Sequence, residues 1–171
     1  MDIKNEIYFS ENVKLGDLNE DNVIKAFKER ITKWYINPID ILNKKKFGFA
    51  SAALSASLID ILAKTENHDL NNKNNRIKYT EWLMKNFEFT DEVALNFYNN
   101  FRCGLIHAGS IESGGYISYD QDQFYKNTND SLIVNPKLLS KKILEKFQNF
   151  IENENPKELF AYLKGRLEEL Q

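Results

Sequence analysis

The sequence is poor in residues that form covalent or metal cross-links. Its 171 residues include one cysteine, Cys103, so no internal disulfide can form. The two histidines, His68 and His107, are 39 positions apart and have no recognisable zinc-ligand spacing with that cysteine. We therefore expect no metal and no other cofactor, and any catalysis is expected to be metal-free.

Long apolar runs are also scarce. The most apolar stretch, Phe47 to Ala63, is broken by three serines and by Asp60, and the residues after Met1 lack the apolar region of a signal peptide. We expect a soluble, cytoplasmic protein without a membrane partner. The content of 42% hydrophobic and 13% aromatic residues excludes a disordered chain, because it is ample for a packed core.

Neither sign of charge is in large excess. The 23 basic and 25 acidic side chains give a net charge of −2, which argues against strong non-specific binding of nucleic acid. A local basic groove remains compatible with this balance. The lysine run Lys44-Lys45-Lys46 is the candidate RNA-binding segment, and its alternative interpretation is a solvated turn between helices.

Helical periodicity dominates the first two thirds of the chain. Apolar spacing predicts helices over about 19–35, 47–64, 76–87 and 90–109, with Asn37-Pro38 interrupting the first. In the second helix we expect a buried face that includes Phe47, Ala50, Leu58 and Leu62. Short connections between helices are typical of an antiparallel bundle.

The pattern changes after residue 109. Residues 114–119 and 131–134 alternate enough to predict a β-hairpin, with the polar stretch between them as its loop. Asn135-Pro136 and Asn155-Pro156 each predict a capped helix start, giving helices over 137–152 and 157–170. The predicted fold is all-α, an antiparallel helical bundle with a small β-hairpin insertion and two C-terminal helices. We expect one domain over residues 1–171, with a core bundle at about 19–109 and the additions at 110–171.

The helix predicted for Thr90 to Gly109 carries the candidate site. At 100° per residue its apolar residues form one stripe, and Arg102 and His107 lie outside it on opposite sides. The outer face carries Leu95, Asn99 and Ile106, which suggests a second packing surface for another helix or another subunit.

An acidic residue in an apolar run also needs an explanation. Asp60 lies in Leu-Ile-Asp-Ile-Leu of the second predicted helix, where an unpaired buried carboxylate would be costly. Arg102 is a candidate partner, and the alternative is that Asp60 points into solvent from the flank of its helix.

The segment Arg102-Cys-Gly-Leu-Ile-His107 resembles the Rx4-6H motif of the HEPN superfamily of helical-bundle proteins. The resemblance covers about 21–109, four helices with the motif near the end of the last. It implies a homodimer whose motifs meet at a cleft and cut RNA without metal. His107 would transfer the proton of the ribose 2′-OH, and Arg102 would bind the scissile phosphate, giving a 2′,3′-cyclic phosphate and a 5′-OH.

We expect Asp60, Asn99 and Cys103 to support the site. Cys103 stands where many family members carry a polar residue, often asparagine, which weakens any hydrogen bond from that position. Gly109 replaces a tyrosine that a partner enzyme modifies in one toxin branch, so that pairing is not supported. A toxin or phage-defence role remains implied, with an antitoxin or defence protein as partner.

Two other interpretations stay open. Arg102 could form a salt bridge across the bundle while His107 stabilises the C-terminal end of its helix. A HEPN-like domain can also be catalytically inactive and serve as a module that binds RNA, nucleotides or another protein.

Overall fold

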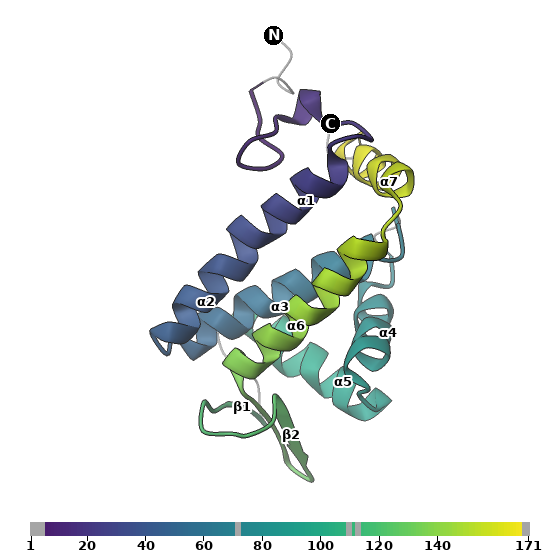
Figure 1. Cartoon of the computed structure of the whole chain (residues 1–171). Helices are drawn as coiled ribbons and strands as arrows, with labels where there is room; N and C mark the ends of the chain where they lie inside the picture. Colours follow the sequence, from purple (N-terminus) through teal and green to yellow (C-terminus); the bar gives the residue numbers. More distant parts are fainter. Residues whose placement is uncertain (1–5, 71–72, 109–110, 112–113, 169–171) are drawn as a thin grey trace.

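The protein is mostly helical, with a small sheet at one end (Figure 1). The computed structural model describes residues 6–70, 73–108, 111 and 114–168, apart from the side chains of residues 107 and 108. The α-helices are α1 (Val23–Ile31), α2 (Asn37–Lys44), α3 (Gly48–Thr65), α4 (Asn75–Phe87), α5 (Asp91–Phe97), α6 (Pro136–Asn153) and α7 (Pro156–Glu168). A 3₁₀ turn, η2 (Leu15–Asp17), and two π-helical segments, η3 (Thr32–Ile36) and η4 (Tyr98–Ala108), complete the helical part.

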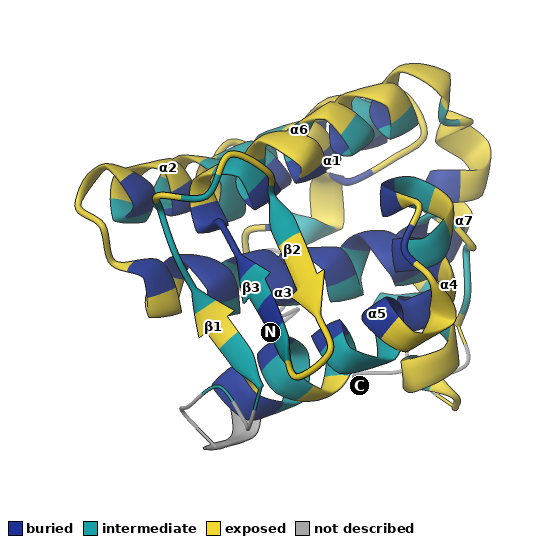
Figure 2. Ribbon diagram, turned by 90° about the horizontal axis from the view of Figure 1, so that it is seen from below, coloured by how far each residue is buried: buried dark blue, intermediate teal, exposed yellow. Residues whose placement is uncertain are grey.

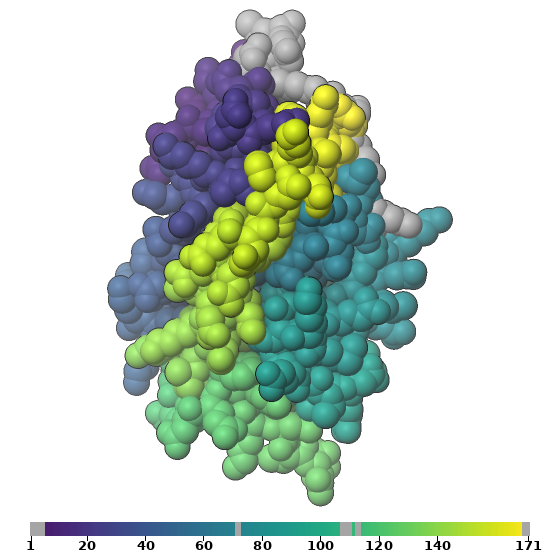
Figure 3. Space-filling view, turned by 45° about the vertical axis from the view of Figure 1, so that its right-hand side comes forward, coloured from purple at the N-terminus to yellow at the C-terminus, as the bar shows by residue number. Residues whose placement is uncertain are grey.

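Helix α3 lies at the centre of the fold. It packs against α2, α4, α6 and η4, and in Figure 2 it lies between α1, α2 and α6 on one side and α4 and α5 on the other. Helices α6 and α7 run diagonally over the face shown in Figure 3, between the N-terminal helices and the α3–α5 region. Among the described residues, the largest fully buried side chains are Phe27, Ile31, Leu58, Ile59, Leu62, Tyr79, Leu83, Phe97, Phe101, Leu132, Leu139 and Phe147.

The buried face of α3 differs from the expected one. Leu58 and Leu62 are fully buried as expected, but Phe47 is 56% exposed and Ala50 is also exposed. Buried small residues occupy much of the inner surface instead, because small side chains let several helices approach one another closely. These residues are Gly48, Ser51, Ala52, Ser55, Ala56 and Ala63.

The expected interruption at Asn37-Pro38 is wrong. Helical structure continues from α1 through η3 into α2, and Pro38 lies at the start of α2. Proline lacks a backbone N–H and clashes with the carbonyl four residues before it. The five π-helical residues before α2 shift the hydrogen-bonding register there, so the chain passes Pro38 without leaving the helix.

The sheet has three strands rather than the two of the expected hairpin. Its order is β1 (Gly115–Ile117), β3 (Ser131–Val134) and β2 (Tyr125–Thr128), with β1 parallel and β2 antiparallel to β3. Strand β2 lies within the stretch expected to be a loop. The aromatic rings of Phe124 and Tyr125 anchor it, because both pack on Phe89, with ring centroids 5.8 and 4.6 Å away.

The two Asn-Pro helix starts are confirmed. The Asn135 side chain accepts hydrogen bonds from the backbone N–H groups of Lys137 (3.0 Å) and Leu138 (3.2 Å) at the start of α6. Asn155 accepts one from Lys157 (3.0 Å) at the start of α7. Within the described residues, no helix combines the length and apolar character needed to cross a bilayer.

Candidate functional site

The segment that carries the candidate site changes helix type in its middle. The Thr90 side chain caps α5 by accepting a hydrogen bond from Val93 N (3.3 Å), and Asp91 and Glu92 occupy its first turn. From Tyr98 the chain continues as η4, a π-helix of eleven residues. The expected single α-helix over Thr90 to Gly109 is therefore wrong in its second half, and Gly109 lies outside the described residues.

The π-helix changes the relation between positions 102 and 107. In a continuous α-helix these positions are about 140° apart around the axis. A π-helix instead links residues five apart, so positions 102 and 107 of η4 lie one turn apart along the axis. The backbone thus brings the two motif positions closer to one face than an α-helix would. The side chain of His107 lies outside the described residues.

Arg102 meets an acid across the bundle. Its Nη2 lies 3.7 Å from Asp60 Oδ2 on α3, and the guanidinium carbon lies 5.6 Å from the centre of the Tyr98 ring. Lys64 Nζ also contacts Asp60 Oδ2, at 3.0 Å. The three charged side chains are only 16–20% exposed. The expected partnership of Asp60 with Arg102 is present, and the alternative that Asp60 points into solvent without a partner is wrong.

The charge of Arg102 is stabilised by its neighbours. Burial by itself would lower the pKa of Arg102, but the Asp60 carboxylate and Tyr98 outweigh it, so the pKa is raised. The pKa of Tyr98 is also raised, first by burial and then by Cys103, to which it is hydrogen-bonded. Cys103 is half-buried and accompanies Arg102 in this cluster rather than facing an open nucleophile site.

Sequence reasoning missed two tyrosines at this site. Tyr79 of α4 is fully buried, and its Oη donates to the Ala56 carbonyl (3.2 Å) on α3. Its ring contacts Tyr98 edge-on, with centroids 5.4 Å apart. Burial, and then the charge of Asp60, raise the pKa of Tyr79 well above its usual value. Tyr98 could have been found from the sequence, because it precedes Arg102 by four residues, a spacing at which helical side chains meet.

The outer face of η4 carries the expected uncovered residues. Ile106 is 41% exposed and Asn99 is exposed, whereas Leu95 on α5 is half-buried. Asn99 belongs to this outer face rather than to the Asp60–Arg102 cluster. Of the two aliphatic side chains expected on this outer face, Ile106 is exposed and Leu95 is not.

The lysine run lies apart from the Arg102 cluster. Lys44 pairs with Asp40 (2.6 Å), and Lys45 and Lys46 are exposed in the turn between α2 and α3. Twelve residues of α3 separate Gly48, just after this turn, from Asp60. At 1.5 Å per residue that is about 18 Å. The structure therefore does not bring the three lysines into contact with Arg102.

A hollow of about 420 Å³ reaches Asp60 from the N-terminal side of the molecule. Asp60 and Lys64 line it together with Trp34 and Arg30, whose guanidinium lies 4.3 Å from the centre of the Trp34 ring. Arg102 is not among its lining residues, so the hollow reaches the carboxylate but not the guanidinium.

His68 has a different environment from the candidate site. Its Nε2 lies 2.8 Å from Glu154 and its Nδ1 lies 3.7 Å from Glu158, and its ring packs on Tyr162. One histidine and two glutamates are a possible set of metal ligands that sequence spacing could not show. The 2.8 Å hydrogen bond between the imidazole and Glu154 accounts for their approach without a metal.

Comparison with protein-family models, with curated proteins and with solved structures gives no match to this chain. Its function is therefore inferred from the chemistry and geometry of its own residues.

Proposed function

We propose that this chain is a metal-independent endoribonuclease of HEPN type that cleaves RNA through the ribose 2′-OH. The observation that carries this proposal is the π-helical geometry of η4, which sets positions 102 and 107 one turn apart. Long π-helical segments are rare, and π-helical turns occur frequently at functional sites.

The chemistry needs two groups at one phosphodiester. His107 takes the proton of the 2′-OH, and the 2′-oxygen attacks the adjacent phosphorus. The bond from phosphorus to the 5′-oxygen breaks, and that oxygen takes a proton from water while the His107 imidazolium releases its own, leaving a 2′,3′-cyclic phosphate and a 5′-OH. Arg102 stabilises the developing charge on the phosphate, because its guanidinium offers two parallel donors. Asp60 holds that guanidinium in place.

The proposal includes a homodimer and a biological setting. Two copies joined through the outer face of η4 would bury Ile106 and bring two motifs together. The single cysteine fits action in the reducing cytoplasm. A toxin or phage-defence role suits a ribonuclease that its own cell must restrain, and an antitoxin or defence protein would be its partner.

A catalytically inactive module is the second candidate. The Arg102–Asp60 ion pair favours it, because a side chain that is 16% exposed and already paired can serve the fold alone. Such a module would bind RNA, nucleotides or another protein without cutting RNA.

The deciding experiment is RNA cleavage in EDTA by the purified wild type, His107→Ala and Arg102→Ala, each checked for folding. We expect wild type to cut single-stranded RNA and to leave all-deoxy DNA of the same sequence intact. Either substitution should lower cleavage by about 10²–10⁴-fold, the loss typical of an acid–base group. Equal cleavage by wild type and His107→Ala would contradict the proposal, and binding without cleavage would favour the inactive module.

A further inference from the structure

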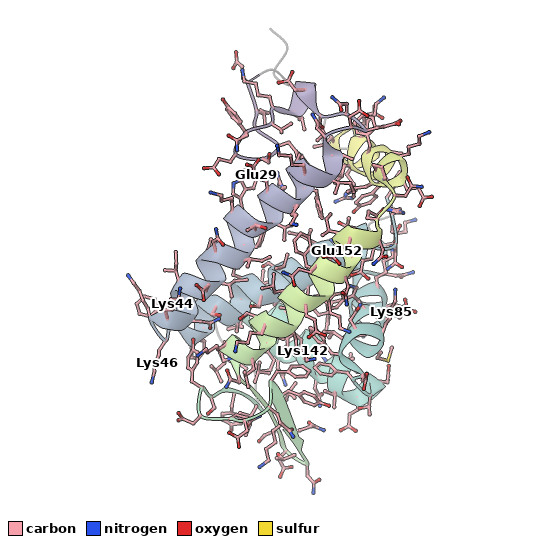
Figure 4. All side chains as sticks on the ribbon, viewed as in Figure 1. Glu29, Lys44, Lys46, Lys85, Lys142 and Glu152 are labelled. Atoms are coloured by element: carbon pink, nitrogen blue, oxygen red, sulfur yellow. The ribbon has the colours of Figure 1, made fainter. Side chains whose placement is uncertain are left out.

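A second hollow, of about 400 Å³, lies where α2 ends, α6 begins and the chain leaves β1. Figure 4 shows Lys44 and Lys46 projecting outward at the end of α2, across from the first turns of α6, where Lys142 is labelled. We call this hollow the lysine cleft, after its four lysines. Its lining consists of Asp40, Asn43, Lys44, Lys46, Tyr119, Asp120, Lys137, Ser140 and Lys141.

The lysine cleft is locally positive in a slightly acidic protein. Four lysines against two aspartates leave an excess of two positive charges, whereas the whole chain has a net charge of −2. Asp40 neutralises Lys44 at 2.6 Å. Among the described residues, no ion pair engages Lys46, Lys137 or Lys141. A hollow whose lining has an excess of positive charge attracts an anion.

The floor of the cleft is a buried hydrogen-bond network. Asn43 is 7% exposed, and its Oδ1 accepts from Ser51 Oγ (2.7 Å) and from Tyr119 Oη (3.1 Å). Its Nδ2 donates to Ser140 Oγ (3.1 Å) on α6. The network joins α2, α3, α6 and the segment after β1. The four lysines therefore project from elements that are fixed to one another.

We propose that the lysine cleft binds the phosphodiester backbone of single-stranded RNA and holds the strand for cleavage. Lysine ammonium groups act as point charges on flexible stems, so they suit phosphates in varied positions rather than one fixed geometry. Among the described residues of the lining Tyr119 is the sole aromatic side chain, so stacking of successive bases contributes little. The strand is recognised by its charge, without sequence preference.

This inference rests on the proposed ribonuclease function and extends it. It adds Lys137 and Lys141 to the run Lys44–Lys46, from a helix about 90 residues further along the sequence. The start of α3 and Asp60 are about 18 Å apart along the helix. A strand anchored in the lysine cleft must therefore extend along the surface to reach Arg102.

The test measures binding apart from cleavage. The probe is a fluorescent single-stranded 2′-O-methyl oligoribonucleotide, which lacks the nucleophile and stays intact, and its anisotropy is followed at several salt concentrations. The test variant is Lys137→Ala/Lys141→Ala. The matched control is Lys142→Ala/Lys146→Ala, which removes the same charge from the same helix outside the cleft lining. Lys142 is paired with Glu145 (3.2 Å).

We expect the cleft variant to bind about tenfold more weakly at low salt, with a salt slope smaller by about 0.7 for each lysine removed. The control variant should stay within about twofold of wild type. The cleft variant should lose the same factor in affinity for an all-deoxy strand, because the cleft recognises only the phosphates. Equal losses in both double variants, or no binding by wild type, would overturn the cleft proposal. Wild type that binds the probe but leaves ordinary RNA uncut would overturn the nuclease proposal alone.

Discussion

Arg102 Nη2 and Asp60 Oδ2 lie 3.7 Å apart, and the same carboxylate oxygen lies 3.0 Å from Lys64 Nζ. Asp60 on α3 thus forms ion pairs with two cations, one from its own helix and one from η4. At 3.7 Å the contact from Arg102 is longer than a charge-assisted hydrogen bond, so Lys64 is the nearer of the two partners.

Removing the charge of Asp60 should destabilise the fold. We expect Asp60→Asn to lower the free energy of unfolding by about 1–2 kcal/mol, between the values for exposed and for buried ion pairs. Asp40→Asn is the matched control, because Asp40 also pairs with a lysine four residues later but is 58% exposed. Its cost should stay below about 1 kcal/mol. Urea denaturation at neutral pH measures both, and equal costs would mean that Arg102 adds nothing to the Asp60 interaction.

Arg102→Lys separates charge from geometry. A lysine keeps the positive charge near Asp60 but cannot make the two parallel contacts of a guanidinium with a phosphate. We therefore expect RNA cleavage at least about 10²-fold below wild type, while the melting temperature changes by only a few degrees. Recovery of near wild-type cleavage by Arg102→Lys would show that the residue acts only through its charge.

Tyr79 should make stability fall at high pH. Its pKa is raised in the folded state, so its contribution is fully present below the ordinary tyrosine pKa of about 10 and is lost as pH rises above it. The unfolded chain then binds fewer protons, and the free energy of unfolding falls by about 1.4 kcal/mol per pH unit for this group. Tyr79→Phe should remove the contribution of Tyr79 to this decrease of the free energy of unfolding with pH.

The control for this titration is the pH dependence of the free energy of unfolding that remains in Tyr79→Phe. Tyr98 also has a raised pKa and is present in both proteins, so their difference isolates Tyr79. Near neutral pH, Tyr79→Phe should cost about 1–2 kcal/mol, because the hydrogen bond to the Ala56 carbonyl is lost. Denaturation curves from about pH 8 to about pH 11 provide the measurement. Parallel pH profiles would show that the Tyr79 hydroxyl does not titrate with unfolding.

The outer face of η4 should form a dimer interface. We expect a dimer at tens of micromolar, and Ile106→Glu should yield a monomer because it places a charge at the centre of the covered face. Ile77→Glu on α4 is the matched control, since Ile77 is 47% exposed and Ile106 is 41% exposed. It should leave the mass unchanged. Light scattering coupled to gel filtration measures the mass, and a wild-type monomer would contradict the prediction.

Local signals allowed much of the fold to be predicted from the sequence. Asn135-Pro136 and Asn155-Pro156 located the starts of α6 and α7, because a cap involves only neighbouring residues. The apolar stripe predicted for the Thr90 to Gly109 segment contains Phe97, Phe101 and Leu105, and these three side chains are buried. The Asp60–Arg102 contact was predictable as a candidate, since an acid in an apolar run requires a partner.

The features that the sequence did not predict depend on contacts between distant parts of the chain. The π-helical register of η3 and η4 depends on packing that an ideal helical wheel does not include. Strand β2 was missed because its position depends on the packing of Phe124 and Tyr125 on Phe89, from a distant part of the chain. Lys137 was not associated with the lysine run for the same reason, since only the folded chain brings α6 beside the end of α2.

Asn135 has contacts in two directions. Besides capping α6, its Nδ2 donates to the carbonyls of Tyr119 (3.2 Å) and Gln121 (2.8 Å), which follow β1. These contacts close short loops of the chain, and closing a short loop costs little conformational entropy. The first turn of α6 and the segment after β1 are therefore coupled through one amide side chain, and we expect them to open together.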